Sequence, residues 1–262
     1  MLLLLDLGNT NLSVGVYQDR ESIYFFKTSS DKLKSIIEYT ELFDQFLMYH
    51  HIDKSKIEGA ILSSVVPQLT RKISVAVSDL IGHECLVISN KLKSGLKINI
   101  DNPNELGADL ICDSIGAVNN HNQNCLVIDV GTATKFLVIT KDKVFKGCTI
   151  CPGMQISARS LWNSAAQLSD VELKAPEYIV GKNTKDSLSA GIVYGHIAMV
   201  RQLCKCIEDE THLTFKKIIT GGDAYIIKDQ LGSEFSYEPK LIFEGLYDIY
   251  MKNLGGKKHE AE

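Results

Sequence analysis

The segment LLLLDLGNTNLSVGV at residues 2–16 is the most informative part of the sequence, because its pattern returns at residues 125–138 as CLVIDVGTATKFLV. Each copy is an apolar strand, then Asp-x-Gly, a short polar turn and a second apolar strand. Each continues through a polar break into a third β-rich segment, at residues 22–27 and 143–150, which is typical of consecutive hairpins. The repeat therefore predicts two similar halves that face each other across a cleft.

The segments between and after the two copies predict mixed α/β halves. Apolar residues recur at helical spacing over residues 31–50, 67–81, 108–121, 187–209 and 241–251. Short apolar runs at residues 57–65, 84–88 and 215–219 fit buried strands. We therefore expect an α/β protein with an N-terminal half at residues 1–122, a C-terminal half at 123–262 and a disordered tail from about residue 254.

Composition narrows the class of protein. The chain has 262 residues, of which 45% are hydrophobic and 23% charged, as in soluble globular proteins. A net charge of -4 argues against nucleic-acid binding. The apolar start is too short for a signal peptide and no run could span a membrane, so we expect a cytoplasmic protein without a membrane partner. The seven cysteines are odd in number, and no His lies close in sequence to Cys148 and Cys151, so we expect buried free thiols rather than disulfides or a metal site.

The Asp-x-Gly turns suit a phosphate ligand. Gly8 lets the backbone approach a ligand closely, and successive amides in such a turn attract phosphate oxygens. Asp6 would repel a phosphate unless a divalent cation lies between them, and Mg²⁺ favours this combination of ligands. Asp129 occupies the same place in the second copy. One such turn is usually structural, whereas two in register favour nucleotide-phosphate chemistry.

Two further features each leave a choice open. Gly221 and Gly222 follow the strand at residues 215–219, where they could let adenine or ribose lie on the backbone or could simply form a strand-to-helix turn. Asp109 stands at the start of the helix at residues 108–121, where the helix N-terminus favours a negative charge. It could accept a proton from a substrate alcohol or could merely cap the helix.

An ordered series of short motifs resembles that of the type III pantothenate kinases and extends from residue 2 to about residue 250. The motifs are DLGNTN at 6–11, SSVVP at 63–67, NPxxxGAD at 102–109, DVGTAT at 129–134, PG at 152–153, GKNT at 181–184, TGG at 220–222 and FEGL at 243–246. The resemblance implies a homodimer with the duplicated actin-like, ribonuclease H-like fold of sugar kinases. It also implies phosphorylation of pantothenate by ATP, the first step of coenzyme A synthesis, with Mg²⁺ and a monovalent cation, K⁺ or NH₄⁺.

The resemblance further implies roles for single residues. The ATP contacts would come from Asp6, Leu7, Gly8, Asn9, Thr10, Asn11, Leu12, Ser13, Thr132, Gly221 and Gly222. The pantothenate contacts would come from Gly107, Ala108, Asp109 and Thr184. Asp109 would be the catalytic base, Asp129 would hold the monovalent cation, and Asp6 would hold Mg²⁺ through water.

The chain departs from the family pattern on the substrate side. Leu110 stands where the family has an Arg that would clamp the pantothenate carboxylate, and Ile100 stands where it has a Tyr. Three interpretations follow. The chain is a pantothenate kinase in which Lys182 or the partner subunit contacts the carboxylate, a same-fold kinase for another small alcohol, or a non-catalytic nucleotide-binding regulatory paralogue.

The second hairpin departs as well, with Lys135 and Leu137 where the family more often has Thr and Asp. Lys135 is either an outward strand residue or an ammonium placed near the site of the monovalent cation, close to Asp129. The second possibility predicts activity without added K⁺ or NH₄⁺.

Overall fold

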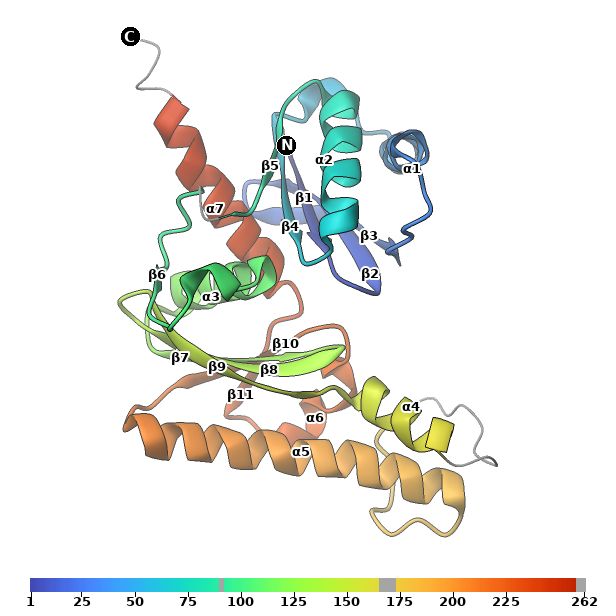
Figure 1. Ribbon diagram of the computed structural model, residues 1–262, viewed down its shortest axis with the longest axis vertical. Helices are drawn as coiled ribbons and strands as arrows, with labels where there is room; N and C mark the ends of the chain where they lie inside the picture. Colours follow the sequence, from blue (N-terminus) through green and yellow to red (C-terminus); the bar gives the residue numbers. More distant parts are fainter. Residues whose placement is uncertain (90–91, 165–172, 258–262) are drawn as a thin grey trace. The chain divides into compact units, whose positions relative to one another are not determined.

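The computed structural model describes residues 1–89, 92–164 and 173–257 and forms two compact units. The first unit contains Met1–Leu96, Asp101–Gly116 and the segment that begins at Leu241, and the second contains Lys97–Ile100 and Ala117–Lys240. Each unit contains three consecutive antiparallel strands, as the repeat predicts (Figure 1).

A five-stranded sheet forms the centre of the first unit, in the order β3-β2-β1-β4-β5. Its strands are β1 (Leu2–Leu7), β2 (Asn11–Gln18), β3 (Glu21–Ser29), β4 (Gly59–Ser64) and β5 (Cys85–Val87). β1 pairs antiparallel with β2 and parallel with β4, and its leucines are buried on both faces. This burial explains the unbroken apolar run that precedes Asp6.

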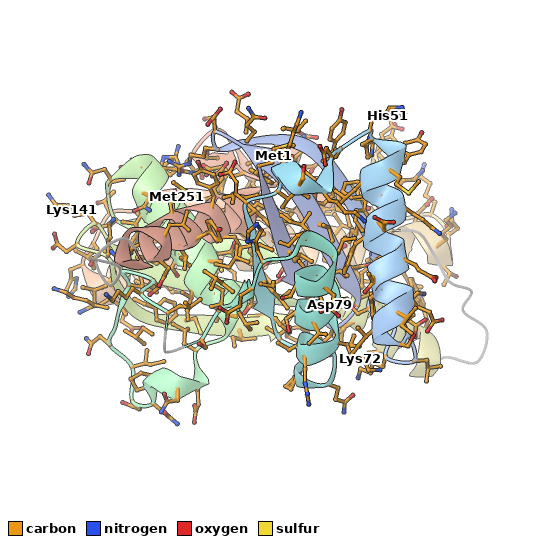
Figure 2. The ribbon with its side chains drawn as sticks, turned by 90° about the horizontal axis from the view of Figure 1, so that it is seen from above. Met1, His51, Lys72, Asp79, Lys141 and Met251 are labelled. Carbon is orange, nitrogen blue, oxygen red and sulfur yellow. The ribbon has the colours of Figure 1, made fainter. Side chains whose placement is uncertain are left out.

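Helices cover this sheet. They are α1 (Ile36–Tyr49), α2 (Pro67–Ile81) and α7 (Leu241–Lys257), with the 3-10 turns η1 (Lys54–Lys56) and η2 (Pro103–Glu105). α1 and α2 join one core with the sheet, while α7 contacts β1 and β4. α2 buries Leu69, Ile73 and Val77, and its Lys72 and Asp79 lie off that apolar stripe (Figure 2).

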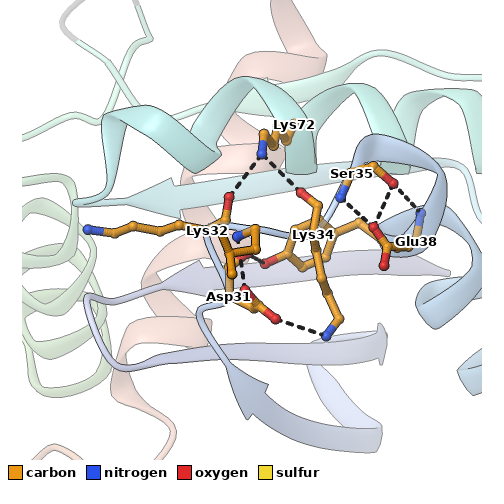
Figure 3. A network of polar contacts seen from close by, with 8 residues as sticks. Asp31, Lys32, Lys34, Ser35, Glu38 and Lys72 are labelled. Carbon is orange, nitrogen blue, oxygen red and sulfur yellow. Dashed lines mark hydrogen bonds and ion pairs between the residues drawn. The ribbon is translucent and has the colours of Figure 1, made fainter.

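The start of α1 is set by side-chain hydrogen bonds (Figure 3). The Ser35 hydroxyl accepts from the Glu38 amide at 3.2 Å, and the Glu38 carboxylate accepts from the Ser35 amide at 2.7 Å. Lys72 on α2 donates to the carbonyl oxygens of Lys32 and Lys34, each at 3.0 Å. Because this capping box begins the helix, residues 31–35 form a capped loop, and the helix expected from residue 31 starts at Ile36 instead.

The second unit has a six-stranded sheet in the order β11-β10-β7-β8-β9-β6. Its strands are β6 (Lys97–Ile98), β7 (Cys125–Val130), β8 (Ala133–Thr140), β9 (Val144–Pro152), β10 (Lys216–Thr220) and β11 (Phe235–Tyr237). Its helices are α4 (Met154–Ser164), α5 (Thr184–Thr211), α6 (Lys228–Leu231) and the 3-10 turn η3 (Ala224–Ile226). α5 places Val193, Ile197 and Val200 in one core with β7 and β8.

The remaining expectations are partly confirmed. The helices expected at residues 67–81 and 108–121 have those bounds, the second being α3 (Ala108–His121), within which the division between the units falls. The tail expected from residue 254 is wrong in its first part, because α7 continues through Lys257; residues 258–262 lie outside the described residues. α4, β6 and β11 were not anticipated, since short elements carry little periodic signal.

Two other expectations can be compared with the structure. All seven cysteines are free, but Cys148 and Cys206 are exposed, which corrects the expectation that all are buried. Within the described residues, no helix has both the length and the apolar character needed to cross a membrane.

Candidate functional site

The β1–β2 hairpin of the first unit is held by its own backbone and by Ser30. The Gly8 amide donates to the carbonyl oxygen of Asn11 at 2.9 Å. Ser30 donates its hydroxyl to the Gly8 carbonyl at 2.6 Å and its amide to the Thr10 carbonyl at 2.9 Å. Asn9 and Thr10 at the tip are exposed. A Cβ at Gly8 would meet only the Asn11 carbonyl, at 3.4 Å, so the fold tolerates one and the bare backbone leaves room for a ligand.

Carboxylates from two distant motifs meet near one buried thiol in the first unit. Burial raises the pKa of Cys112 well above its ordinary value, and the charges of Asp113, Asp6 and Asp109 raise it further. Ser63, which pairs in register with Asp6, also hydrogen-bonds this thiol, so the end of β1 lies beside α3. The structure therefore brings Asp6 of β1 and Asp109 of α3 into one neighbourhood.

Sequence reasoning missed Asp113. It lies one helical turn after Asp109 on α3 and is 3% exposed. An acidic residue four positions after another on a helix shares its face, and this spacing was the available signal. Ser63 on β4 is buried and pairs in register with Asp6 of β1.

The turn before α3 shapes the position of Asp109. A Cβ at Gly107 would lie 2.5 Å from Oδ1 of Asp109, so only glycine leaves room for this carboxylate orientation. Asn102 accepts from the Asn104 amide at 3.2 Å and donates to the Glu105 carboxylate at 2.8 Å, which orders η2. Asp109 itself is partly exposed, in the first turn of α3.

Leu110 and Ile100, the two residues that differ from the family pattern on the substrate side, have different surroundings. Leu110 is 7% exposed and packs in the interior, so it presents no polar group. Ile100 is partly buried and belongs to the second unit. Neither residue replaces an Arg clamp by its own chemistry.

The β7–β8 hairpin of the second unit is enclosed by two glycine-containing turns. A Cβ at Gly153 would lie 2.6 Å from the Thr132 carbonyl oxygen, and the Gly153 amide donates to that oxygen at 3.1 Å. Gly221 has a φ of 96°, and a Cβ there would collide with Oδ1 of Asp129 and lie 2.5 Å from the Val130 carbonyl oxygen. Of the predicted ATP contacts, Thr132 therefore lies in the turn of this hairpin and Gly221 on a segment packed against the end of β7.

Asp129 forms an ion pair across the same hairpin. Oδ2 of Asp129 lies 2.7 Å from Nζ of Lys135, and the two residues face each other in the β7–β8 register. The side chains are 15% and 21% exposed, respectively. The carboxylate expected to hold a monovalent cation thus already contacts a positive charge.

The predicted substrate contact Thr184 is the first residue of α5. Asn183 caps this helix by accepting from the Asp186 amide at 2.9 Å. Thr184 and Lys182 are both exposed. The amino end of a helix attracts anions, so this segment suits a negatively charged ligand group.

A buried histidine under the second hairpin was not identified from the sequence. Nε2 of His196 on α5 lies 2.9 Å from Oγ1 of Thr134 on β8. Burial lowers the pKa of His196 to about 4, so the ring is neutral near pH 7. The folded state therefore favours the neutral His196 ring over the protonated ring.

The lowered pKa of His196 makes the stability of the folded state depend on pH. Because the folded-state pKa is below the ordinary 6.5, the stabilisation is complete above pH 6.5 and is lost as the pH falls toward about 4. In that window we expect wild-type stability to fall faster than that of His196→Gln, by at most about 1.4 kcal/mol per pH unit. Urea unfolding across this pH range measures the difference. Parallel curves for the two proteins would contradict the assignment.

An apolar hollow of about 390 Å³ lies between α4 and α5, lined by residues that include Leu161, Ile192 and Met199. Ile156 and Leu161 on α4 remain 45% and 48% exposed. Across the described ranges, no three His, Cys, Asp or Glu side chains are grouped closely enough to hold a metal by themselves.

Known proteins resemble this chain in sequence and in fold. The family model described as type III pantothenate kinase matches residues 2–206. A type III pantothenate kinase of Sulfurihydrogenibium sp. (strain YO3AOP1) is 36% identical over 247 residues, covering 94% of this chain and 98% of the relative.

Two solved structures show the fold. A protein described as a 2-dehydro-3-deoxygalactonokinase from Sinorhizobium meliloti matches 96% of each chain with a TM-score of 0.58 at 9% identity. MreB 5 of Spiroplasma citri, bound to AMPPNP, matches 100% of this chain and 98% of that chain with a TM-score of 0.53 at 10% identity. The expected α/β fold of the actin-like and sugar-kinase type is thereby confirmed.

Proposed function

Since this chain belongs to the type III pantothenate kinase family and is an ATP-dependent pantothenate kinase, we propose that Asp109 is the base that accepts the proton of the pantothenate hydroxyl. The observation that carries this role is the packing of α3 beside the end of β1: Ser63, which pairs in register with Asp6, hydrogen-bonds the thiol of Cys112, three residues after Asp109. It supports a base located beside the phosphate-binding turn of the same unit.

The proposed transfer is an in-line displacement at the γ-phosphorus of ATP. The alcohol oxygen forms a bond to the γ-phosphorus, the bond from that phosphorus to the β–γ bridging oxygen breaks, and ADP leaves. Asp109 takes the alcohol proton as the new bond forms. The amides and hydroxyls of residues 6–13, with Thr132, Gly221 and Gly222, would hold the nucleotide.

Asp6 suits a Mg²⁺ ion held together with phosphate oxygens. It is a partly buried carboxylate at the end of β1, directly before the exposed hairpin tip. Mg²⁺ usually keeps several waters and takes only one or two carboxylates, so a single Asp with ATP phosphates is sufficient. When bound, the ion would neutralise charge on the phosphates.

The monovalent cation expected at Asp129 does not fit the residues present. A ligand oxygen for K⁺ must be open to the ion, but Oδ2 of Asp129 accepts a hydrogen bond from the Lys135 ammonium at 2.7 Å. A second cation at that oxygen would be repelled by the first.

For the pantothenate carboxylate we propose the amino end of α5. Lys182 supplies an exposed positive charge two residues before Thr184, and the helix end adds its partial positive charge. Lys182 and the helix end would contact the pantothenate carboxylate in place of the family's Arg, where this chain has Leu110.

A coupled ADP-release assay with purified protein, MgATP and pantothenate tests the function. Turnover with pantothenate at low substrate concentration supports it. Turnover only with other small alcohols would favour a same-fold kinase of different specificity. Nucleotide binding without turnover on any alcohol would favour a regulatory paralogue. Because the enzyme consumes ATP, we also propose a cytoplasmic location.

We further propose that the α4–α5 face forms a homodimer interface. The hollow between these helices and the exposed Ile156 and Leu161 leave apolar surface that a second copy could cover. We expect Leu161→Asp to shift the protein from dimer to monomer in sedimentation velocity, because a charge would be buried there. Ile37→Asp, at a 70% exposed site on α1, is the matched control. A wild-type monomer at high concentration would contradict the proposal.

A further inference from the structure

The two copies of the repeat differ at one position that faces the strand-end carboxylate. In the first copy, Asp6 of β1 pairs with Ser13 of β2. In the second copy, Asp129 of β7 pairs with Lys135 of β8. The second turn is one residue shorter, yet Lys135 lies directly opposite its carboxylate, as the neutral hydroxyl of Ser13 does in the other half of the same chain.

The geometry of Lys135 excludes an outward-pointing strand lysine. Its side chain is only 21% exposed and its Nζ donates to Oδ2 of Asp129 at 2.7 Å. Lys146 on β9, by contrast, is exposed. The ammonium is therefore fixed on the carboxylate, in a setting where screening by salt is weak.

The carboxylate is held in place from its other side. The bare Cα of Gly221 packs against Oδ1 of Asp129, at a position where no side chain fits. The Asp223 amide donates to the Val130 carbonyl at 2.9 Å and ties the same turn to β7. Asp129 and Lys135 thus form a pair at the base of a turn that the proposed function assigns to ATP.

We propose that the Lys135 ammonium is a built-in cation that takes the place of a free monovalent cation at Asp129. The inference rests on the proposed function, since it assigns the charge balance of that same nucleotide site. A tethered ammonium stays at its carboxylate at any salt concentration, because its attachment replaces a bimolecular binding step. MgATP binding and turnover are then independent of K⁺ and NH₄⁺.

The first test compares the wild-type protein with and without KCl, with choline chloride holding the ionic strength constant. Titration calorimetry measures MgATP affinity, and ADP release with pantothenate measures turnover. We expect both quantities to change by less than about twofold, since the Lys135 ammonium already occupies the cation position at Asp129. A strict requirement for K⁺ or NH₄⁺ in either measurement overturns the inference.

The second test uses Lys135→Ser, which reproduces the Ser13 arrangement of the first hairpin. Without K⁺ we expect MgATP affinity to fall about tenfold to hundredfold, because the Asp129 carboxylate near the phosphates loses the ammonium that offsets its charge. KCl should restore most of this loss and should raise the thermal unfolding midpoint of the variant, but not that of the wild type.

Lys146→Ser is the matched control, because it removes the same charge from an exposed position of the same sheet. It should behave as the wild type at every salt composition. If Lys135→Ser matches this control, or if the folded variant is not rescued by any monovalent cation, the inference is wrong.

The outcomes separate this inference from the proposed function. Potassium-independent MgATP binding without turnover on pantothenate would refute the function and leave the role of Lys135 standing. Turnover on pantothenate that depends on K⁺ would support the function and refute the role of Lys135.

Discussion

Asp109→Asn is expected to lower turnover about 10³-fold while changing MgATP affinity little. The amide has nearly the same shape as the carboxylate, so the Gly107 turn and the start of α3 should be kept. It cannot accept the alcohol proton during transfer. Removing one negative charge near Asp6 and Asp113 should not weaken phosphate binding, because like charges repel.

Steady-state ADP release and calorimetric titration with MgATP measure the two effects. Asp101→Asn is the control, because it removes an exposed carboxylate from the same unit. If Asp109→Asn keeps turnover close to that of the wild type, Asp109 serves only the helix start and another group is the base.

Gly221→Ala is expected to lower the free energy of unfolding by about 2–4 kcal/mol and turnover about hundredfold. The methyl group would meet the Asp129 carboxylate and the backbone of Val130, and a φ of 96° is unfavourable for alanine. The turn would have to move, and Asp129 with its Lys135 partner would move with it.

Gly82→Ala separates the two causes of this effect. Gly82 has a φ of 71°, but a Cβ there would meet nothing within 4 Å. It should therefore show only the cost of the backbone conformation, about 1 kcal/mol. Urea unfolding and ADP release measure both variants. Equal losses at the two positions would show that crowding at Asp129 is unimportant.

The fold was predictable where periodicity is strong. Pro67 starts α2 and Gly82 ends it in a left-handed conformation, so local chemistry alone sets both bounds. The helix at 31–50 was placed too early, because the capping box at Ser35 competes with the apolar spacing that precedes it. The short strands β6 and β11 are formed by pairing with β9 and β10, respectively. No local sequence pattern encodes this pairing.

The sequence motifs of the candidate site could be predicted, but the residues that pack around those motifs could not. The Asp-x-Gly copies and Gly107-Ala108-Asp109 are local signals that a sequence displays directly. Asp113 shows only its spacing of four residues from Asp109 and His196 shows no local signal, because their importance comes from burial beside residues distant in the chain. Lys135 was recognised as either outward or near Asp129, and its side-chain contact chooses between them.

The duplicated hairpins can be predicted without coordinates, because apolar runs, Asp-x-Gly and polar breaks are properties of adjacent residues. It also determined the family, because the order of many short motifs is read without coordinates. Three features required the folded structure: the end of β1 lies beside α3, Leu110 is interior and α7 packs with the first unit. These facts depend on which distant segments pack together, and packing is settled by burial of the whole core rather than by any local pattern.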